Sequence, residues 1–176
     1  MTLLKGRMSA GAPGGYWEVF DEAQHSDVVR QDTDDSCGPA CAEMLFRSRG
    51  ISSISQQDIV AVQGSERSTD ESLAEAMNSI QREQRLDDGG DWYSAWWNTL
   101  SAPLDLFRRL ARHGPFITSV KSFGSDSHMV VIDGFDATDR VAVRDPYEGT
   151  RYFMTWGEFQ RVWQGMSVWW SPRRTS

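Results

Sequence analysis

Apolar residues in the first half of the chain recur at the three- and four-residue spacing of an α-helix. Between residues 37 and 49 this spacing is carried by side chains that include Met44 and Leu45. Pro39 is tolerated in the first turn of a helix, and Gly50 supplies a stop at its end. The pattern therefore predicts a helix that begins at Cys37.

Three further helices are expected before residue 115. The first covers about residues 55–62. Ser68 and Glu71 have the three-residue spacing of a capping box, which predicts a second helix that starts at Ser68 and continues to about residue 84. Residues 104–111 form an amphipathic segment, and the His-Gly-Pro at 113–115 is a typical helix end.

The spacing shortens after residue 115, where short segments rich in β-branched and aromatic residues are separated by Gly, Asp, Ser and Pro. Such segments are typical of strands joined by turns. They comprise residues 116–121, 128–134, 140–144 and 150–154. The order of elements indicates an α+β domain in which N-terminal helices pack on a C-terminal antiparallel sheet.

The sheet segments are followed by a second capping-box spacing, formed by Thr155 and Glu158. This spacing predicts a short helix that includes Phe159 and continues to Trp163. Residues 167–170 are apolar and aromatic, which predicts a last strand after that helix.

Two regions follow neither period. Residues 1–15 are small, Gly-rich and aperiodic, and we interpret them as a flexible tail ahead of a single domain at residues 16–176. Residues 86–100 carry the turn-forming run Asp-Asp-Gly-Gly at 87–90, followed by closely spaced aromatic residues. We interpret this second region as a loop that leads into an aromatic patch.

Length and composition are those of one folded domain. A chain of 176 residues can bury a single core, and eight Trp residues argue against disorder. A net charge of -7 and a pI near 4.9 work against phosphate binding, so nucleic acid is not expected as a partner. With only two cysteines a disulfide framework cannot form. No apolar run is long enough to predict membrane insertion.

The N-terminal residues lack the apolar run and cleavage site of a secretory signal. The default expectation is therefore a cytoplasmic protein. The alternative is export by a secretion system that does not require a signal peptide, because its substrates lack such a signal too.

Cys37 lies at the N-terminal end of its predicted helix, where backbone N–H groups and the helix dipole favour a thiolate. The alternative is a buried structural cysteine. Gln31 lies six positions earlier, and its amide can join the backbone N–H of Cys37 in an oxyanion hole. Taken alone, Gln31 is interpreted as a solvated loop residue.

His128 opens one predicted strand and Asp145 closes the next, so a hairpin brings the two side chains together. A carboxylate that holds Nδ1–H of a histidine leaves Nε2 facing a thiol, which is the arrangement we predict. The alternatives are a structural histidine at a strand start and an ordinary Asp145-Pro146 turn.

Two segments resemble those of papain-like peptidases. QDTDDSCGPAC, residues 31–41, is similar to their glutamine-to-cysteine segment, and HMVVIDGFDATDRVAVRDP, residues 128–146, is similar to their histidine-to-aspartate hairpin. The family with the greatest similarity is that of the double-glycine leader peptidases of bacteriocin exporters and their stand-alone relatives. The resemblance covers about residues 24–172 and includes the helix that begins with TWGEF at 155–159. Residues 63–100 align with nothing in that family.

This resemblance implies a papain-like fold with the catalytic cysteine at the start of the central helix. It implies that Cys37 is the nucleophile, His128 the base, Asp145 the residue that orients the histidine, and Gln31 part of the oxyanion hole. A peptide or protein substrate is implied, with no cofactor. The sequence has no transporter membrane segments or ATP-binding motifs, so leader processing coupled to export does not carry over.

A metal site is not expected. Cys37, Cys41 and either His25 or His128 could be combined as zinc ligands, but the four-residue cysteine spacing on a helix and the unpaired histidines fit poorly. A Cys37–Cys41 disulfide is also disfavoured by helix geometry. We interpret Cys41 as a core residue.

Three other features have both a structural and a functional interpretation. The acidic run that includes Asp32, Asp34 and Asp35 is either a solvated loop or a selector of basic substrate residues. Gly14-Gly15 is either part of a flexible tail or a self-processing site. The third feature is a set of tryptophans that form either core and lid or a substrate-binding groove, namely Trp92, Trp96 and Trp97.

The leading hypothesis is hydrolysis of a peptide or amide bond through a thioacyl-enzyme at Cys37. A glutamine deamidase or transglutaminase of the same fold is an alternative, in the form of an effector or toxin with an immunity or secretion partner. A catalytically silent peptide-binding module is the alternative from another class. The sequence does not separate these activities or give the oligomeric state.

Overall fold

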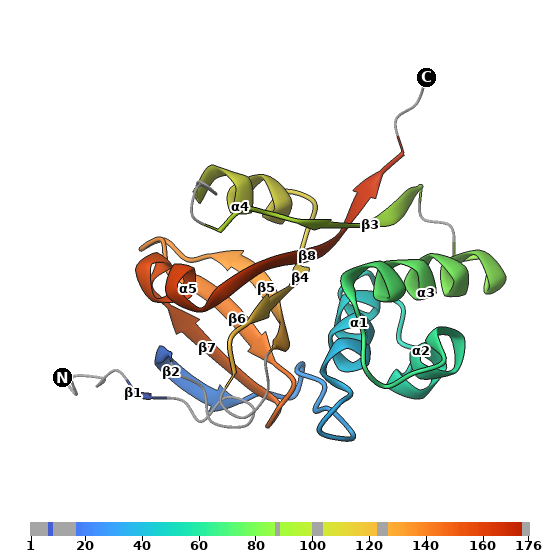
Figure 1. The fold of residues 1–176 in the computed structure, drawn as a ribbon, viewed down its shortest axis with the longest axis horizontal. Helices are drawn as coiled ribbons and strands as arrows, with labels where there is room; N and C mark the ends of the chain where they lie inside the picture. Colours follow the sequence, from blue (N-terminus) through green and yellow to red (C-terminus); the bar gives the residue numbers. More distant parts are fainter. Residues whose placement is uncertain (1–6, 9–16, 87–88, 100–103, 123–126, 174–176) are drawn as a thin grey trace.

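The computed structural model contains the antiparallel sheet that the second half of the sequence predicts, and the sheet extends further than expected (Figure 1). The structure describes residues 7–8, 17–86, 89–99, 104–122 and 127–173. Its eight strands lie in the order β1-β2-β7-β6-β5-β4-β8-β3. Their bounds are β1 Arg7–Met8, β2 Glu18–Gln24, β3 Gly90–Trp96, β4 Phe116–Val120, β5 His128–Phe135, β6 Val141–Asp145, β7 Thr150–Met154 and β8 Trp163–Pro172.

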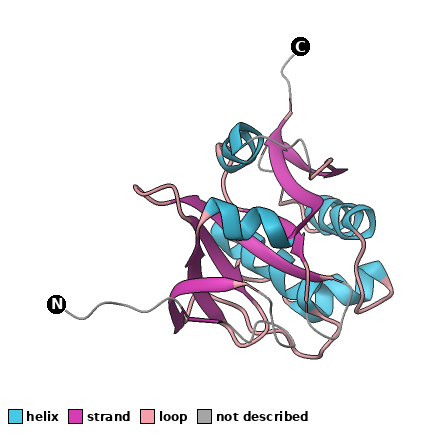
Figure 2. Ribbon diagram, turned by 60° about the vertical axis from the view of Figure 1, so that its left-hand side comes forward, coloured by secondary structure: helices cyan, strands magenta, loops and turns pink. Residues whose placement is uncertain are grey.

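Five helices in the described residues accompany the sheet and lie on both of its faces (Figures 1 and 2). Helices α1 to α3 pack on one face, and α4 and α5 pack on the other. Their bounds are α1 Cys37–Ser48, α2 Gln56–Gln63, α3 Asp70–Glu83, α4 Leu104–Ala111 and α5 Trp156–Val162. The predicted α+β class, with N-terminal helices packed on an antiparallel sheet, is confirmed.

The alternation of side chains along β5 explains why the sheet has a core on each face. Met129 and Val131 point into the core shared with α1, α2 and α3. Val130 and Ile132 point into the core shared with α4 and α5. Because successive side chains of a strand point to opposite faces, an uninterrupted apolar run lets β5 join two helical layers.

The start of α3 differs from the prediction. Its N-cap is Thr69 and not Ser68, and the partner in the capping box is Ser72 and not Glu71. Both hydroxyl groups satisfy backbone N–H groups that the first helical turn leaves without partners. Ser68 instead donates its hydroxyl hydrogen to Gln63 Oε1 at 2.9 Å, which closes the turn between α2 and α3.

The prediction of a loop at residues 86–100 is wrong, because residues 90–96 form strand β3. Each of its residues has a partner on β8, from Gly90 opposite Pro172 to Trp96 opposite Met166. Consecutive aromatic residues concealed the alternation in the sequence. Strand β8 is correspondingly longer than the predicted segment 167–170, since it pairs with β4 at one end and with β3 along the other edge.

Trp92 is a core residue. Its side chain is 3% exposed, and its ring lies edge-on to Phe46 of α1 with centroids 5.7 Å apart. Its indole N–H donates to Gln81 Oε1 of α3 at 3.1 Å, so the one polar atom of the side chain is satisfied inside the core.

A strand that the sequence did not reveal precedes the helices. Strand β2 pairs with β7, and the two residues of β1 pair with β2. Apart from β1, the predicted tail at residues 1–15 lies outside the described residues. The N-terminal part of the domain therefore contributes to the sheet as well as to the helices.

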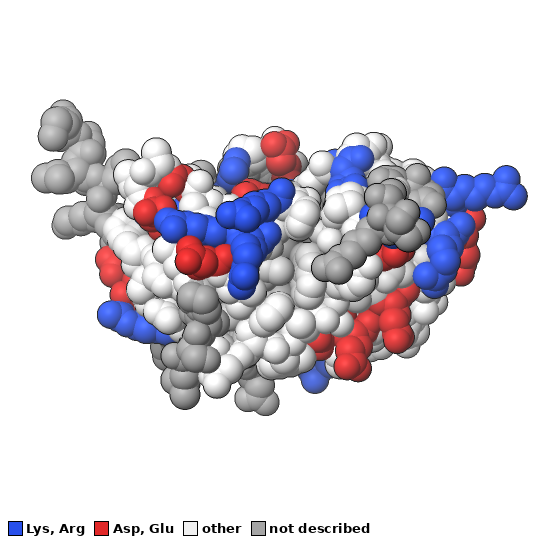
Figure 3. Space-filling model, turned by 90° about the horizontal axis from the view of Figure 1, so that it is seen from above, with Lys and Arg blue, Asp and Glu red and all other residues white. Residues whose placement is uncertain are grey.

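Charges of both signs are interspersed on the face seen from above (Figure 3). Among the described residues drawn there, this face shows no continuous basic surface of the kind that binds nucleic-acid phosphates. Separately, none of the helices in the described ranges has the length and apolar character needed to cross a bilayer.

Replacing Trp92 by alanine is expected to lower the free energy of unfolding by about 3 to 5 kcal/mol, because it removes a buried ring from a packed core. Trp96→Ala is the matched control, since that ring is 66% exposed, and it should cost less than about 1 kcal/mol. Urea denaturation followed by circular dichroism measures both. Equal losses in the two variants would contradict this placement of Trp92.

Candidate active site

Three predicted site residues meet where the start of α1 approaches the sheet. Cys37 is the first residue of α1, His128 the first residue of β5, and Asp145 the last residue of β6. Strands β5 and β6 are neighbours in the sheet, and α1 packs against β5. The helix and the hairpin therefore supply one site from residues that are far apart in the sequence.

His128 and Asp145 form a buried pair. His128 Nε2 lies 2.7 Å from Asp145 Oδ1, and the two side chains are 3% and 1% exposed. Our prediction that the carboxylate would hold Nδ1 is wrong, because the ring presents Nε2 to the carboxylate. Nδ1 is thus the ring nitrogen left for the thiol. The rotation of the ring about its Cβ–Cγ bond decides this, and sequence spacing carries no information on that rotation.

The carboxylate of Asp145 has two further hydrogen bonds. Oδ1 accepts from the backbone N–H of Tyr147 at 2.9 Å, and Oδ2 accepts from the hydroxyl of Tyr152 at 3.1 Å. Burial raises the pKa of Asp145, but the charge and hydrogen bond of His128 outweigh it, aided by these two donors. The pKa is lowered below its ordinary value, so the carboxylate is ionised despite its burial.

The electrostatics of His128 follow from that carboxylate. Burial lowers the pKa of His128, but the charge and hydrogen bond of Asp145, followed by the hydrogen bond and charge of Cys37, raise it to about 10. The imidazole is therefore protonated at neutral pH. This is the state that can give a proton to a leaving group.

Cys37 responds in the opposite direction. Burial raises the pKa of its thiol, whereas the hydrogen bond and charge of His128 and backbone hydrogen bonds of Met129 and Gly38 lower it. The net result is a pKa below the ordinary value of 9.0. The lowered pKa of Cys37 and the raised pKa of His128 favour a thiolate–imidazolium pair, which is the reactive form of a cysteine nucleophile.

Cys41, one helical turn further on, has the opposite character. It is fully buried, its thiol lies 3.3 Å from the backbone carbonyl of Met129, and burial raises its pKa well above 9.0. The interpretation of Cys41 as a core residue is confirmed, and both cysteines are free thiols. Within the described ranges, no group of three or more His, Cys, Asp or Glu side chains could hold a metal ion.

Gln31 lies in the loop that leads to Cys37. Its side chain is 9% exposed, and its amide nitrogen donates to the carbonyl of Thr33 at 2.8 Å. That carbonyl also accepts from the backbone N–H of Ser36 at 3.3 Å. The Gln31 amide is thus fixed beside the turn that opens α1, and the second hydrogen of its NH₂ group is not used by this bond.

The loop around Gln31 is anchored from both sides of the site. The backbone N–H of Gln31 donates to the carbonyl of Pro146 at 2.8 Å, directly after Asp145. On the other side, the Gln56 amide of α2 donates to the carbonyl of Arg30 at 2.8 Å and accepts from the backbone N–H of Asp32 at 3.2 Å. The loop is therefore tied to the hairpin that carries the histidine's partner.

Gly38 allows a close approach beside the nucleophile. A Cβ placed on Gly38 would lie 2.5 Å from Ser68 Oγ and 3.1 Å from Met129 Sδ. Any larger residue would push apart the start of α1, the turn before α3 and β5. This explains in physical terms why the residue after the cysteine is glycine.

Two of the three predicted tryptophans remain accessible. Trp96 is 66% exposed, and its indole N–H donates to Asp70 Oδ1 at 2.8 Å. Trp97 is half-buried and packs against Trp169 with ring centroids 6.0 Å apart. Of the set, Trp96 offers the largest accessible surface.

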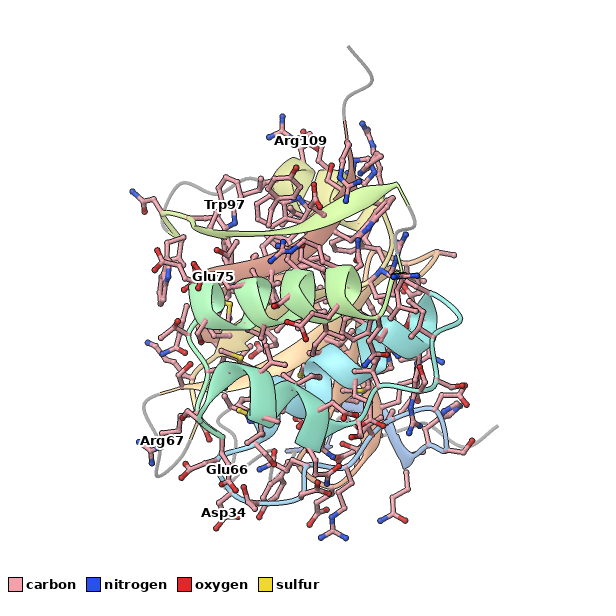
Figure 4. The ribbon with its side chains drawn as sticks, turned by 90° about the vertical axis from the view of Figure 1, so that its right-hand side faces the viewer. Asp34, Glu66, Arg67, Glu75, Trp97 and Arg109 are labelled. Atoms are coloured by element: carbon pink, nitrogen blue, oxygen red, sulfur yellow. The ribbon has the colours of Figure 1, made fainter. Side chains whose placement is uncertain are left out.

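The acidic run before Cys37 is largely occupied by partners within the chain. Asp35 forms an ion pair with Arg67 at 2.9 Å, and Asp32 accepts a hydrogen bond from Gln57. Glu66 accepts from the Thr33 hydroxyl at 2.9 Å. Figure 4 shows Asp34, Glu66 and Arg67 close together at the end of the molecule opposite Arg109. The Gly14-Gly15 pair lies outside the described residues.

Tyr152 is a site residue that sequence reasoning missed. It lies on β7 opposite Val143, which places it on the same face of the hairpin as Asp145, two residues further along β6. A register prediction for the β6–β7 hairpin would have identified it. Burial and the charge of Asp145 raise its pKa well above 10, so the hydroxyl remains a donor.

Comparison with known proteins gives a family match and structural relatives. The model of the family described as "Peptidase_C39 like family" matches residues 22–168. The peptidase domain of Streptococcus ComA, a bifunctional ABC transporter involved in quorum sensing, has a TM-score of 0.65 and 22% identity, over 85% of this chain and 100% of that one. A double-glycine motif protease from an AMS/PCAT transporter, in complex with the leader peptide, has a TM-score of 0.57 and 20% identity. This match covers 83% of this chain and 91% of that one. These two likenesses show a shared fold.

A curated relative has higher sequence identity. "Cysteine protease effector 1" of Escherichia coli O1:K1:H7 is 36% identical over 159 residues, which is 90% of this chain. The match spans 29% of that relative's length.

The ion pair predicts how the reactivity of Cys37 depends on pH. Alkylation by iodoacetamide should already be fast below pH 9.0, because His128 favours the thiolate. His128→Ala removes this effect and should move the midpoint of the alkylation rate upward by at least about one pH unit. Mass spectrometry of the modified peptide, which separates Cys37 from Cys41, measures it. An unchanged midpoint would show that His128 does not control the thiol.

Tyr152→Phe is expected to lower kcat/KM about tenfold, because Asp145 loses one of the donors that hold its carboxylate in place. The same loss raises the pKa of Asp145, so the acid limb of the pH–rate profile should move to higher pH. A purely structural role for the hydroxyl would lower the melting temperature and leave the pH profile unmoved.

Proposed function

This chain belongs to the peptidase C39-like family of cysteine peptidases, and from that premise we propose that Cys37, His128, Asp145 and Gln31 form its catalytic machinery. The observation that carries the proposal is the buried His128–Asp145 pair, 2.7 Å apart, which is hydrogen-bonded to a thiol of lowered pKa. Burying an ion pair costs desolvation free energy, so the His128–Asp145 pair contributes little to the stability of the fold. Its burial at this junction is therefore better explained by a catalytic role.

In the first half of the reaction the Cys37 thiolate attacks the carbonyl carbon of a peptide bond. A C–S bond forms, and the carbonyl oxygen gains the negative charge. The amide N–H of Gln31 and the backbone N–H of Cys37 donate to that oxyanion. The imidazolium of His128 then gives its proton to the amide nitrogen, the C–N bond breaks, and a thioester remains on Cys37.

In the second half, neutral His128 takes a proton from water, whose oxygen attacks the thioester carbon. The C–S bond breaks, the carboxylic acid product leaves, and the thiolate–imidazolium pair is restored. Asp145 keeps the imidazole orientation constant through both halves and stabilises its positive charge. No redox partner or cofactor takes part in these steps.

The substrate that we propose is a peptide segment of a protein. This is supported by the structural relative that is a double-glycine motif protease in complex with the leader peptide. The relative named as an effector supports action on a protein of another cell, with secretion or immunity partners encoded elsewhere. Under this proposal the domain is synthesised in the cytoplasm and is then exported from it as an effector.

Cys37→Ala is expected to lower peptide cleavage by at least about a thousandfold, because the nucleophile is lost. The assay incubates a proteome-derived peptide library with the protein and identifies new peptide termini by mass spectrometry. Cys41→Ala is the matched control, one turn along the same helix, and should retain cleavage.

Two results would contradict the proposal. Cleavage that persists in Cys37→Ala would exclude the nucleophile. Conversion of glutamine to glutamate without new termini would identify a deamidase, in which the same thioester forms on a side-chain amide.

A further inference from the structure

A groove of about 970 Å³ opens beside the start of β5, and the mechanism above does not use it. Its lining includes Trp96 of β3, Lys121 after β4, Ser127 before β5, Gln160 and Arg161 of α5, and Trp163 at the start of β8. Trp163 is buried, and its indole N–H donates to Thr118 Oγ1 at 2.8 Å, so this side chain is a fixed part of the floor.

The groove is adjacent to the proposed base. Ser127 directly precedes His128, and Lys121 follows Val120, which is the residue opposite His128 in the β4–β5 pair. The backbone N–H of Lys121 donates to the carbonyl of Val162 at 2.8 Å, which ties this wall to α5. The position of Lys121 relative to His128 is therefore set by backbone hydrogen bonds.

The opposite wall leads back towards the nucleophile. The exposed ring of Trp96 is held by its hydrogen bond to Asp70, the first residue of α3. Two residues before Asp70, Ser68 lies against Gly38, the neighbour of Cys37. The groove thus adjoins His128 through Ser127, and its Trp96 wall is connected to the start of α1 through Asp70 and Ser68.

The charge of the groove is opposite to that of the whole chain. The chain carries a net charge of -7, yet the described lining residues include two cations, Lys121 and Arg161, and no carboxylate. Arg161 pairs with Glu158, but its side chain is 73% exposed and keeps donors free for a second partner. Lys121 is also exposed.

We propose that this groove is a substrate subsite that binds an acidic side chain within a few residues of the scissile bond. Lys121 and Arg161 attract the carboxylate, and the ring of Trp96 packs against the neighbouring part of the peptide. The inference rests on the proposed peptidase function and adds the chemical class of sequence that the enzyme selects.

The acidic run before Cys37 makes the opposite prediction, because free carboxylates there would select basic residues. Asp35 already pairs with Arg67, and Asp32 already accepts from Gln57. Arg161 pairs with Glu158 in the same way, so among the described residues Lys121 is the unpaired cation of the groove and Asp34 the unpaired carboxylate of the run. A substrate preference for Asp and Glu indicates the basic groove, whereas a preference for Lys and Arg indicates the acidic run.

The test compares cleavage of a proteome-derived peptide library by the wild-type protein and by the double variant Lys121→Glu, Arg161→Glu. The wild type is expected to enrich Asp and Glu at one position near the cleaved bond. For a peptide with that acid, the double variant should lower kcat/KM about tenfold, mostly through KM. For the matching peptide with Lys at that position, kcat/KM should rise. Arg109→Glu, an exposed change on α4, is the matched charge control and should alter neither.

The possible outcomes distinguish this inference from the proposed function. Cleavage that depends on Cys37 but shows no acidic preference, or a preference that the double variant retains, overturns the subsite and leaves the peptidase intact. A preference for Lys or Arg overturns it in favour of the acidic run. Absence of any Cys37-dependent cleavage is a failure of the proposed function itself. Circular dichroism of each variant excludes misfolding as the cause.

Discussion

The buried pair of His128 and Asp145 is the interaction on which the rest of the site depends. A carboxylate that is 1% exposed is stable only if its charge is compensated, and here a cation and two neutral donors compensate it. In the turn between β6 and β7, the carbonyl of Pro146 accepts from the backbone N–H of Gln31, and the carbonyl of Gly149 accepts from that of His25. The segment that orients the histidine therefore also positions the loop that leads to the nucleophile.

The fold supplies this pair with a thiol from a different layer. Helix α1 is buried against β5, and Gly38 lets its first turn approach Ser68 and Met129 closely. Backbone hydrogen bonds from Gly38 and Met129 then reach the sulfur of Cys37. Packing between the helical layer and the sheet thus determines the chemistry, because a shift of either layer would separate the sulfur from the imidazole. Cys41, on the same helix but fully buried without such donors, remains a neutral thiol.

Much of this arrangement could be predicted from local signals. The proline in the first turn of α1, the histidine at a strand start and the aspartate before a proline gave the correct elements and brought the correct residues together. Strand β3 could not be predicted, because its stability comes from pairing with β8, about 75 residues away, and not from its own alternation. The nitrogen that faces Asp145 could not be predicted either, since side-chain rotation leaves no trace in spacing. Trp92 and Trp96 look alike in the sequence and, being four residues apart, lie on the same face of β3. Only tertiary packing distinguishes them, because Phe46 and Gln81 cover Trp92 while Trp96 is exposed.

The basic groove extends the same reasoning to specificity, since its walls are set by the β4–β5 pair and by the contact of Trp96 with α3. The central claim, however, is the charge state of His128. ¹⁵N NMR of the imidazole rings measures it directly, with three histidines to assign. The account predicts that both ring nitrogens of His128 carry a proton at pH 7 and that the ring loses one only near pH 10. A His128 that is neutral at pH 7 and titrates near the ordinary value of 6.5 would contradict it.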